Sequence, residues 1–187
     1  SRGLGDVYKR QELEAKAFRK ILRTLKSNFD HVLIDAPAGI ERSLRGLLSN
    51  EINECVLVCT PDDVCIRNAE RTASVLRKKG LTAQRVIVNR LNPDYIRRGE
   101  MYAAQTVALT LDMPLLGEIP EDAEIYRALL HHQSVMEGES EGRNAIARIA
   151  LRMTTDEDVP LPEYGQKRTL FQRLFQRRKK GDEKHVR

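Results

Sequence analysis

Four short apolar runs, separated by longer segments with helical periodicity, limit the folds open to this chain. The runs span residues 31–35, 54–60, 85–90 and 114–120. The first enters an Ala-Pro-Ala-Gly loop and the second stops at Pro61, as is typical of parallel strands buried on both faces. Strands that alternate with helices are joined by crossover connections, so the pattern predicts an α/β three-layer sandwich with a mostly parallel sheet.

Apolar residues at three- and four-residue steps predict the helices. The helices expected from this period span residues 12–28, 63–79, 100–111, 121–132 and 142–154. Pro160, Pro162 and Gly165 then interrupt the pattern, and the chain becomes rich in Arg, Lys and Gln. We therefore expect one domain over residues 12–156, a linker over 157–166 and a tail over 167–187.

Composition excludes several classes of protein. A chain of 187 residues that is 41% hydrophobic can bury one core, and we expect neither a membrane-spanning helix nor a secretory leader. The three cysteines, Cys55, Cys59 and Cys65, form no metal-binding Cys-x-x-Cys pair. Their odd number favours buried thiols in a reducing compartment over disulfides, and so a cytoplasmic protein.

The net charge of +5 is concentrated at one end of the chain. Residues 165–187 hold nine Lys or Arg against Asp182 and Glu183, whereas residues 1–164 hold 23 basic and 25 acidic residues. An anionic partner is therefore expected at the tail.

The most informative polar residue is the last residue of the first apolar run. Asp35 ends that run, which is the Walker B arrangement of a carboxylate that holds Mg²⁺, often through water. Gly39 follows four residues later, and a glycine there lets backbone N–H groups approach a terminal phosphate. A helix cap or an ordinary loop residue is the alternative interpretation of Asp35.

The complete set of strand ends narrows this interpretation. It comprises Asp35-Ala-Pro-Ala-Gly-Ile-Glu41, Thr60-Pro61, Asn89-Arg90 and Gly117-Glu-Ile-Pro-Glu-Asp122. Together they resemble the septum-site-determining MinD family, within the MinD/ParA group of P-loop ATPases, over residues 12–180. The resemblance implies a P-loop NTPase fold that binds ATP and Mg²⁺.

The resemblance also implies roles for individual residues. Asp35 would be the carboxylate near Mg²⁺, and Gly39 would lie by the γ-phosphate. Asn89 and Arg90 would lie at the adenine, while Pro120, Glu121 and Asp122 would form the loop that closes over the base. Turn formation and helix capping are the alternatives for these positions. Asn68 departs from the family, which usually carries an aspartate there, so a partner or dimer contact that needs this charge is in doubt.

A phosphate-binding loop is not found in the sequence. Neither Gly3-Leu-Gly5 nor Lys79-Gly80 supplies the glycine-rich string followed by Lys and Ser/Thr that this chemistry needs. The chain therefore resembles the C-terminal portion of such an ATPase, with a non-native leader over residues 1–11. We expect this portion to bury its apolar faces incompletely, to be marginally stable or to aggregate, and not to hydrolyse ATP.

The basic tail has the pattern of a helix that lies in a membrane interface. Leu170, Phe171, Leu174 and Phe175 share one helical face, and the cations beside and behind it include Arg173, Arg177, Lys179 and Lys180. A disordered tail and a nucleic-acid contact are the alternatives. The paired Phe and Leu favour anionic lipid, because phosphate binding does not need an apolar face.

These features favour an ATP-driven switch in bacterial division-site placement. An ATP-dependent homodimer would hold the inner face of the cell membrane through its tails, as a peripheral cytoplasmic protein. Its partners would be the division inhibitor and the ATPase activator of the Min system, with no nucleic acid. The alternatives are a ParA-like DNA-partition ATPase and a non-enzymatic module that recruits partners to the membrane.

Overall fold

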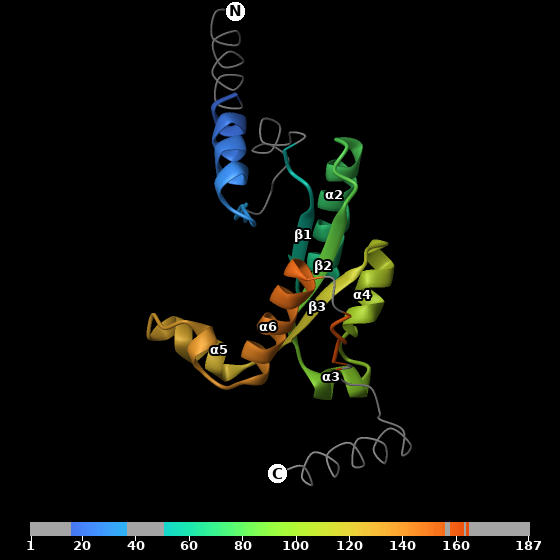
Figure 1. Ribbon diagram of the computed structural model, residues 1–187. Helices are drawn as coiled ribbons and strands as arrows, with labels where there is room; N and C mark the ends of the chain where they lie inside the picture. Colours follow the sequence, from blue (N-terminus) through green and yellow to red (C-terminus); the bar gives the residue numbers. More distant parts are fainter. Residues whose placement is uncertain (1–15, 37–50, 156–157, 163, 165–187) are drawn as a thin grey trace, which may run out of the picture.

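A parallel sheet of three strands forms the centre of the computed structural model, which describes residues 16–36, 51–155, 158–162 and 164. The strands are β1 (Cys55–Cys59), β2 (Gln84–Leu91) and β3 (Leu115–Pro120), in the order β1-β2-β3 (Figure 1). Leu57 pairs with Val86 across the first ladder, and Val88 pairs with Glu118 across the second. The predicted α/β fold with a mostly parallel sheet is confirmed.

Helices cover both faces of this sheet. On one face, α2 (Asp63–Lys78) and α4 (Ala104–Leu111) pack against Val86 and Val88 of β2. On the other face, α6 (Glu141–Thr154) packs against Ile87 and against β3. Because successive side chains of a strand point to opposite faces, the apolar run of β2 supplies both cores.

Close packing between α6 and β3 depends on a glycine in the strand. A Cβ built on Gly117 would lie 2.1 Å from Cγ1 of Ile149 in α6, far inside van der Waals contact. Arg152 of the same helix donates from Nε to the carbonyl of Leu116 at 2.8 Å. It also donates from Nη1 to the carbonyl of Val159 at 2.5 Å, so one guanidinium joins α6, β3 and the segment that follows α6.

The predicted helix 100–111 is wrong in its first turn. The structure instead has a short helix, α3 (Pro93–Arg98), and then α4, which begins at Ala104. Asn92 caps α3 by accepting bonds from the N–H groups of Asp94 and Tyr95, and Pro93 occupies the first turn. Gly99 ends α3 with φ of +76°, a conformation that glycine adopts without strain, so the two helices are separate.

The last two predicted helices are present with shifted ends. They are α5 (Ala123–Leu130), which is shorter than predicted, and α6, and the single turn η1 (Val135–Glu137) lies between them. No residue of α5 is buried. In Figure 1 the α5–η1 segment extends away from the sheet.

The predicted strand over residues 31–35 is wrong. Residues 31–36 have no regular secondary structure, and the side chain of Leu33 is 82% exposed. A buried parallel strand needs a neighbour on each side, and no segment that the structure describes pairs with this run. The preceding helix is present over residues 16–28, and its Arg23 and Lys26 bond to Glu51 at 2.6 and 3.0 Å, just before β1 begins.

The cysteine thiols are free, and Cys59 is buried as expected. Burial, followed by the nearby Cys65 and Asp62, raises the pKa of the Cys59 thiol to about 11. Cys55 and Cys65 are only partly buried.

Among the described residues, no helix is both long enough and apolar enough to cross a bilayer. The expected leader (residues 1–11) and the expected tail (167–187) lie outside the described residues, whereas residues 158–162 and 164 of the expected linker are described.

Candidate functional site

The carboxyl ends of β2 and β3 bring two of the predicted motifs together. Leu91 pairs with Pro120 in the ladder, and the N–H of Glu121 donates to the carbonyl of Leu91 at 2.8 Å. Arg90 Nη2 lies 3.4 Å from Glu121 Oε1, with both side chains largely exposed. The Asn89-Arg90 and Pro120–Asp122 motifs, about 30 residues apart in sequence, therefore form one edge, followed by α3 and α5 in Figure 1.

An irregular turn of the backbone shapes the β2 side of this edge. Arg90 has φ of +61°, which is uncommon for a residue other than glycine, and the ladder with β3 shifts register between Val88 and Leu91. Asn89 supports the turn, because its Oδ1 accepts a bond from the N–H of Arg90 at 2.9 Å. Strained backbone of this kind often occurs at ligand sites.

Asp122 fixes the β3 side of the edge. Its Oδ1 accepts from the N–H of Glu124 at 2.8 Å and caps α5, while its Oδ2 accepts from the N–H of Gly142 at 2.7 Å at the start of α6. Partial burial raises the pKa of the Asp122 carboxyl. The bonds from Gly142, Ser140 and Glu124 outweigh this effect, so the pKa is lowered. Helix capping, the alternative interpretation, is thus the contact that the structure shows for Asp122.

Two residues near Asp122 were not singled out from the sequence. Gly142 allows the close approach of α6, since a Cβ there would lie 2.9 Å from Asp122 Oδ2 and 2.5 Å from Cδ1 of Ile125. Ser140 caps α6 by accepting from the N–H of Arg143 at 3.1 Å. The Ser-Glu-Gly string at positions 140–142, just before an amphipathic run, is the signal that would have marked this turn.

The structure does not bring the predicted magnesium ligand to this edge. Asp35 is exposed, and the segment 16–36 lies beside the start of β1, at the end of the sheet opposite to the carboxyl ends of β2 and β3 (Figure 1). Gly39 lies outside the described residues. The role of Asp35 at Mg²⁺ stays a prediction, and so does the role of Gly39 at the phosphate.

The resemblance places the residues of this edge at the base of a nucleotide and not at its phosphates. Asn89 is partly buried and offers an amide, whereas Pro120 is buried in β3. The guanidinium of Arg90 already faces the carboxylate of Glu121, so its charge is partly compensated. The described residues contain no cluster of three His, Cys, Asp or Glu side chains that could hold a metal ion.

The family of the chain follows from comparison with known proteins. A model of the anion-transporting ATPase family matches residues 14–153. The chain belongs to this family. Among curated proteins, the chain is 32% identical over 161 residues to the septum site-determining protein MinD of Helicobacter pylori. That match covers 82% of this chain and 59% of the relative, so the chain spans little more than half of the relative's length.

The structure of this chain is also similar to solved structures of MinD proteins. The MinD cell division protein of Aquifex aeolicus matches with a TM-score of 0.74 at 26% identity, covering 79% of this chain and 63% of that one. The MinC:MinD complex of the same organism matches with a TM-score of 0.70 at 26% identity, covering 80% and 63%. MinD of Pyrococcus horikoshii, complexed with Mg-ADP, matches with a TM-score of 0.63 at 29% identity, covering 74% and 56%.

Proposed function

We propose that this chain is the base-binding part of an ATP-dependent switch in bacterial division-site selection. The observation that carries the proposal is the meeting of Asn89-Arg90 with Pro120–Asp122 at one edge of a MinD-like sheet. The likeness to a MinD bound to Mg-ADP supports nucleotide and Mg²⁺ as its ligands. The family consists of ATPases, which supports ATP hydrolysis by a protein that also carries a phosphate-binding loop.

Within this proposal the residues divide into a base side and a phosphate side. Asn89 and Arg90 would face the adenine, and Pro120 to Asp122 would close over it. Asp35 would hold Mg²⁺ through water, and Gly39 would lie by the γ-phosphate. Because the sequence has no loop that could neutralise the phosphates, we expect these 187 residues alone to leave ATP unhydrolysed.

Mapping the bound ligand by nuclear magnetic resonance tests the base side. Adenosine is titrated into the 15N-labelled chain, and the amide shifts are followed. We expect saturable shifts at residues 89–92 and 120–124, and their loss in Asn89→Ala, because that change removes the amide and its support of the Arg90 turn. Leu109→Ala, on the outer side of α4, is the matched control. Shifts elsewhere, or none, would contradict the base site.

The membrane half of the proposal concerns the tail, which lies outside the described residues. A helix with Leu170, Phe171, Leu174 and Phe175 on one face would bury them in the interface, and each nearby cation would add roughly 1 kcal/mol at an anionic surface. One tail would bind reversibly. Two tails on an ATP-dependent homodimer would bind far more tightly, so nucleotide state would set membrane residence at the inner face of the cell.

The remaining partners belong to the same proposal. The likeness to a MinD that was solved in complex with MinC supports an inhibitor protein of the Min system as a partner. An activator of ATP hydrolysis and the absence of nucleic acid from the cycle complete the scheme. A ParA-like DNA-partition ATPase is the second candidate, because a tail rich in Arg and Lys could also contact phosphates.

Vesicle flotation separates lipid from nucleic acid as the target of the tail. We expect the full chain to float with vesicles that contain phosphatidylglycerol and not with vesicles of phosphatidylcholine alone. Phe171→Ser with Phe175→Ser should abolish flotation, because it removes both aromatic side chains of the apolar face and leaves every cation in place. Binding to duplex DNA without binding to vesicles would reverse the order of the two candidates.

A further inference from the structure

The helix over residues 16–28 separates its charged side chains from its apolar ones. It holds no acidic residue, and its five cations are Lys16, Arg19, Lys20, Arg23 and Lys26. At 3.6 residues per turn, these cations fall within about a third of the helix circumference and extend over about 15 Å of its axis. We call this surface the cationic arc. The apolar side chains lie on the opposite side of the helix, and Leu22 among them is only 3% exposed.

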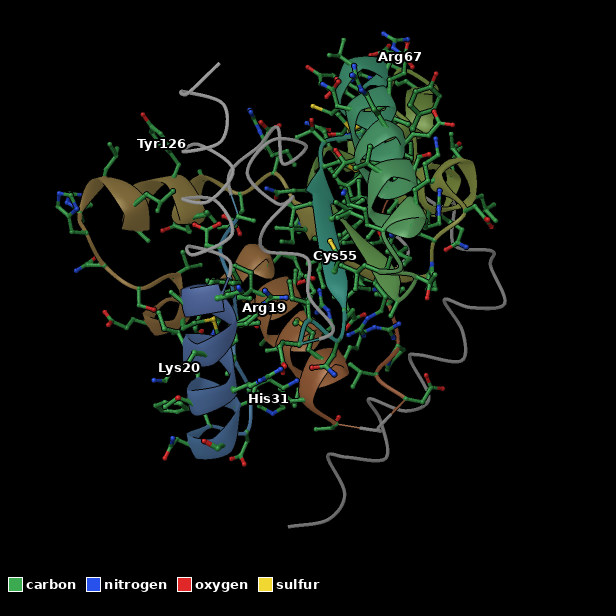
Figure 2. All side chains as sticks on the ribbon, turned by 90° about the horizontal axis from the view of Figure 1, so that it is seen from above. Arg19, Lys20, His31, Cys55, Arg67 and Tyr126 are labelled. Atoms are coloured by element: carbon green, nitrogen blue, oxygen red, sulfur yellow. The ribbon has the colours of Figure 1, made fainter. Side chains whose placement is uncertain are left out.

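The cations of the arc gather at one place on the surface. A single hollow is lined by Lys16, Arg19, Lys20 and Arg23. Figure 2 shows Arg19 and Lys20 on this helix. Several positive charges therefore face the same space, where a group with negative charge could contact more than one of them.

The carboxylate of Glu51 is shared by cations of the arc. Its Oε1 lies 2.6 Å from Arg23 Nε, and Lys26 donates to its backbone carbonyl at 3.0 Å. The bond from Arg23 lowers the pKa of the Glu51 carboxyl, and the charges of Arg23, Lys26 and Arg19 lower it further. One negative charge cannot neutralise three positive ones, so this part of the arc keeps a surplus of positive charge.

The charge of the remaining sequence is opposite in sign. Outside the helix 16–28 and the basic tail over residues 165–187, the chain holds 18 Lys or Arg against 25 Asp or Glu. The arc and the tail are therefore two positive segments of a chain that is otherwise net negative. An anionic surface attracts these two segments and repels the rest, so its field would turn both of them toward it.

The arc has the chemistry of a contact with lipid head groups. Protein can cover such an arc only by placing carboxylates against it, whereas the phosphates of an anionic bilayer supply the negative charge directly. The apolar side of the helix faces away from the arc, so the contact needs no insertion into the hydrocarbon. Two contacts with one bilayer, through the arc and through the tail, would strengthen each other by effective concentration.

We propose that the cationic arc of the helix 16–28 is a second lipid-binding surface, which binds the phosphate groups of anionic lipids and holds the chain against a bilayer together with the tail. The choice of lipid rests on the proposed function, in which the tail binds the same surface. Because the arc inserts no apolar side chain, its contribution is electrostatic and decreases as the salt concentration rises.

Partitioning of the full chain into vesicles that contain phosphatidylglycerol tests this proposal. Arg19→Gln with Lys20→Gln removes two charges, spares the two cations that bond to Glu51, and keeps good helix formers in place. We expect its partition coefficient in dilute buffer to fall about 25-fold, because each cation near an anionic surface contributes about fivefold. At about 1 M salt, which screens these charges, the variant and the wild type should differ little.

A variant with the same loss of charge is the matched control. Arg97→Gln with Arg98→Gln changes two exposed cations of α3, which lies at the end of the sheet opposite to the helix 16–28 (Figure 1). We expect this variant to partition as the wild type does. An equal fall for both double variants would show that only the net charge matters, and would overturn the proposal.

The tail variant Phe171→Ser with Phe175→Ser separates this proposal from the proposed function. If the tail variant loses binding while Arg19→Gln with Lys20→Gln partitions as the wild type does, the arc is overturned and the tail stands. If the tail variant binds as the wild type does while the arc variant is weakened, the tail is overturned and the arc stands. An arc variant that is weakened only toward duplex DNA would assign the arc to nucleic acid and overturn lipid as its partner. A wild type that does not bind the vesicles would overturn both.

Discussion

At the scale of single residues, the segment after α6 is held to the domain by a tyrosine. The hydroxyl of Tyr164 accepts from Arg148 Nη2 at 3.1 Å and donates to Glu141 Oε1 at 3.3 Å. Leu161 and Tyr164 also pack against the core between the sheet and helices α2 and α4. The last described residue before the basic tail therefore contacts the N-terminus of α6, where Asp122 is also bound.

The environment of Tyr164 makes the free energy of unfolding decrease at alkaline pH. Burial, and then the charge of Glu141, raise the pKa of Tyr164 from an ordinary value of 10.0 to about 12. Since the folded pKa lies above the unfolded one, the contribution of this group is complete below pH 10.0 and is lost as the pH rises toward 12. Tyr164→Phe should fall less steeply in stability over that range, as measured by urea unfolding. Tyr126→Phe, on exposed α5, should follow the wild type (Figure 2); equal slopes for all three proteins would contradict the prediction.

At the scale of elements, Asp122 joins two helices to the end of one strand. Asp122→Ala removes the cap of α5 and the acceptor for Gly142 of α6, and each such contact is worth about 1 kcal/mol. We expect a loss of about 2 kcal/mol in the free energy of unfolding in urea, against about 1 kcal/mol for Asp62→Ala, which caps one helix, α2, and otherwise accepts from the hydroxyl of the neighbouring Thr60. Asp122→Asn keeps one of the two acceptor oxygens and should lose less than Asp122→Ala. A smaller loss for Asp122→Ala than for Asp62→Ala would disprove the double role.

The strands were predictable because a parallel strand covered on both faces carries a continuous apolar run, such as Val56-Leu57-Val58 in β1, Val86-Ile87-Val88 in β2 and Leu115-Leu116 in β3. The same pattern wrongly predicted a strand at residues 31–35. An apolar run shows that a segment can be buried, but it does not show whether a neighbouring strand is present. Asn92 and Pro93 carry the signals of a helix start, and α3 could have been predicted from them. The positive φ of Arg90 could not, because its cause is the shifted ladder with β3.

The meeting of the two motifs at the candidate site was predictable from the order of the strands in the sheet. Asn89-Arg90 and Pro120–Asp122 follow neighbouring parallel strands, so their meeting follows from the topology. The bond from Gly142 to Asp122 depends on how α5 turns the chain back, which no local pattern encodes. Asp35 lies far from this edge because no described segment pairs with the run 31–35, so the run does not join the sheet beside β2 and β3.

At the scale of the whole molecule, we propose a nucleotide site of which this chain carries one side. Two strand ends would form the base side, whereas the predicted magnesium ligand Asp35 is exposed and Gly39, predicted at the γ-phosphate, lies outside the described residues. In this proposal the chain binds only the base, so the phosphates of ATP should add nothing to its affinity. This expectation distinguishes a base-binding part from a complete ATPase site.

The most direct test is a calorimetric titration of the 187-residue chain with adenosine and with Mg-ATP under the same conditions. We expect equal and weak binding of the two ligands, with Kd of about 1 mM or higher. Micromolar binding of Mg-ATP, well above the affinity for adenosine, would show that the phosphates are held by this chain and would contradict the account.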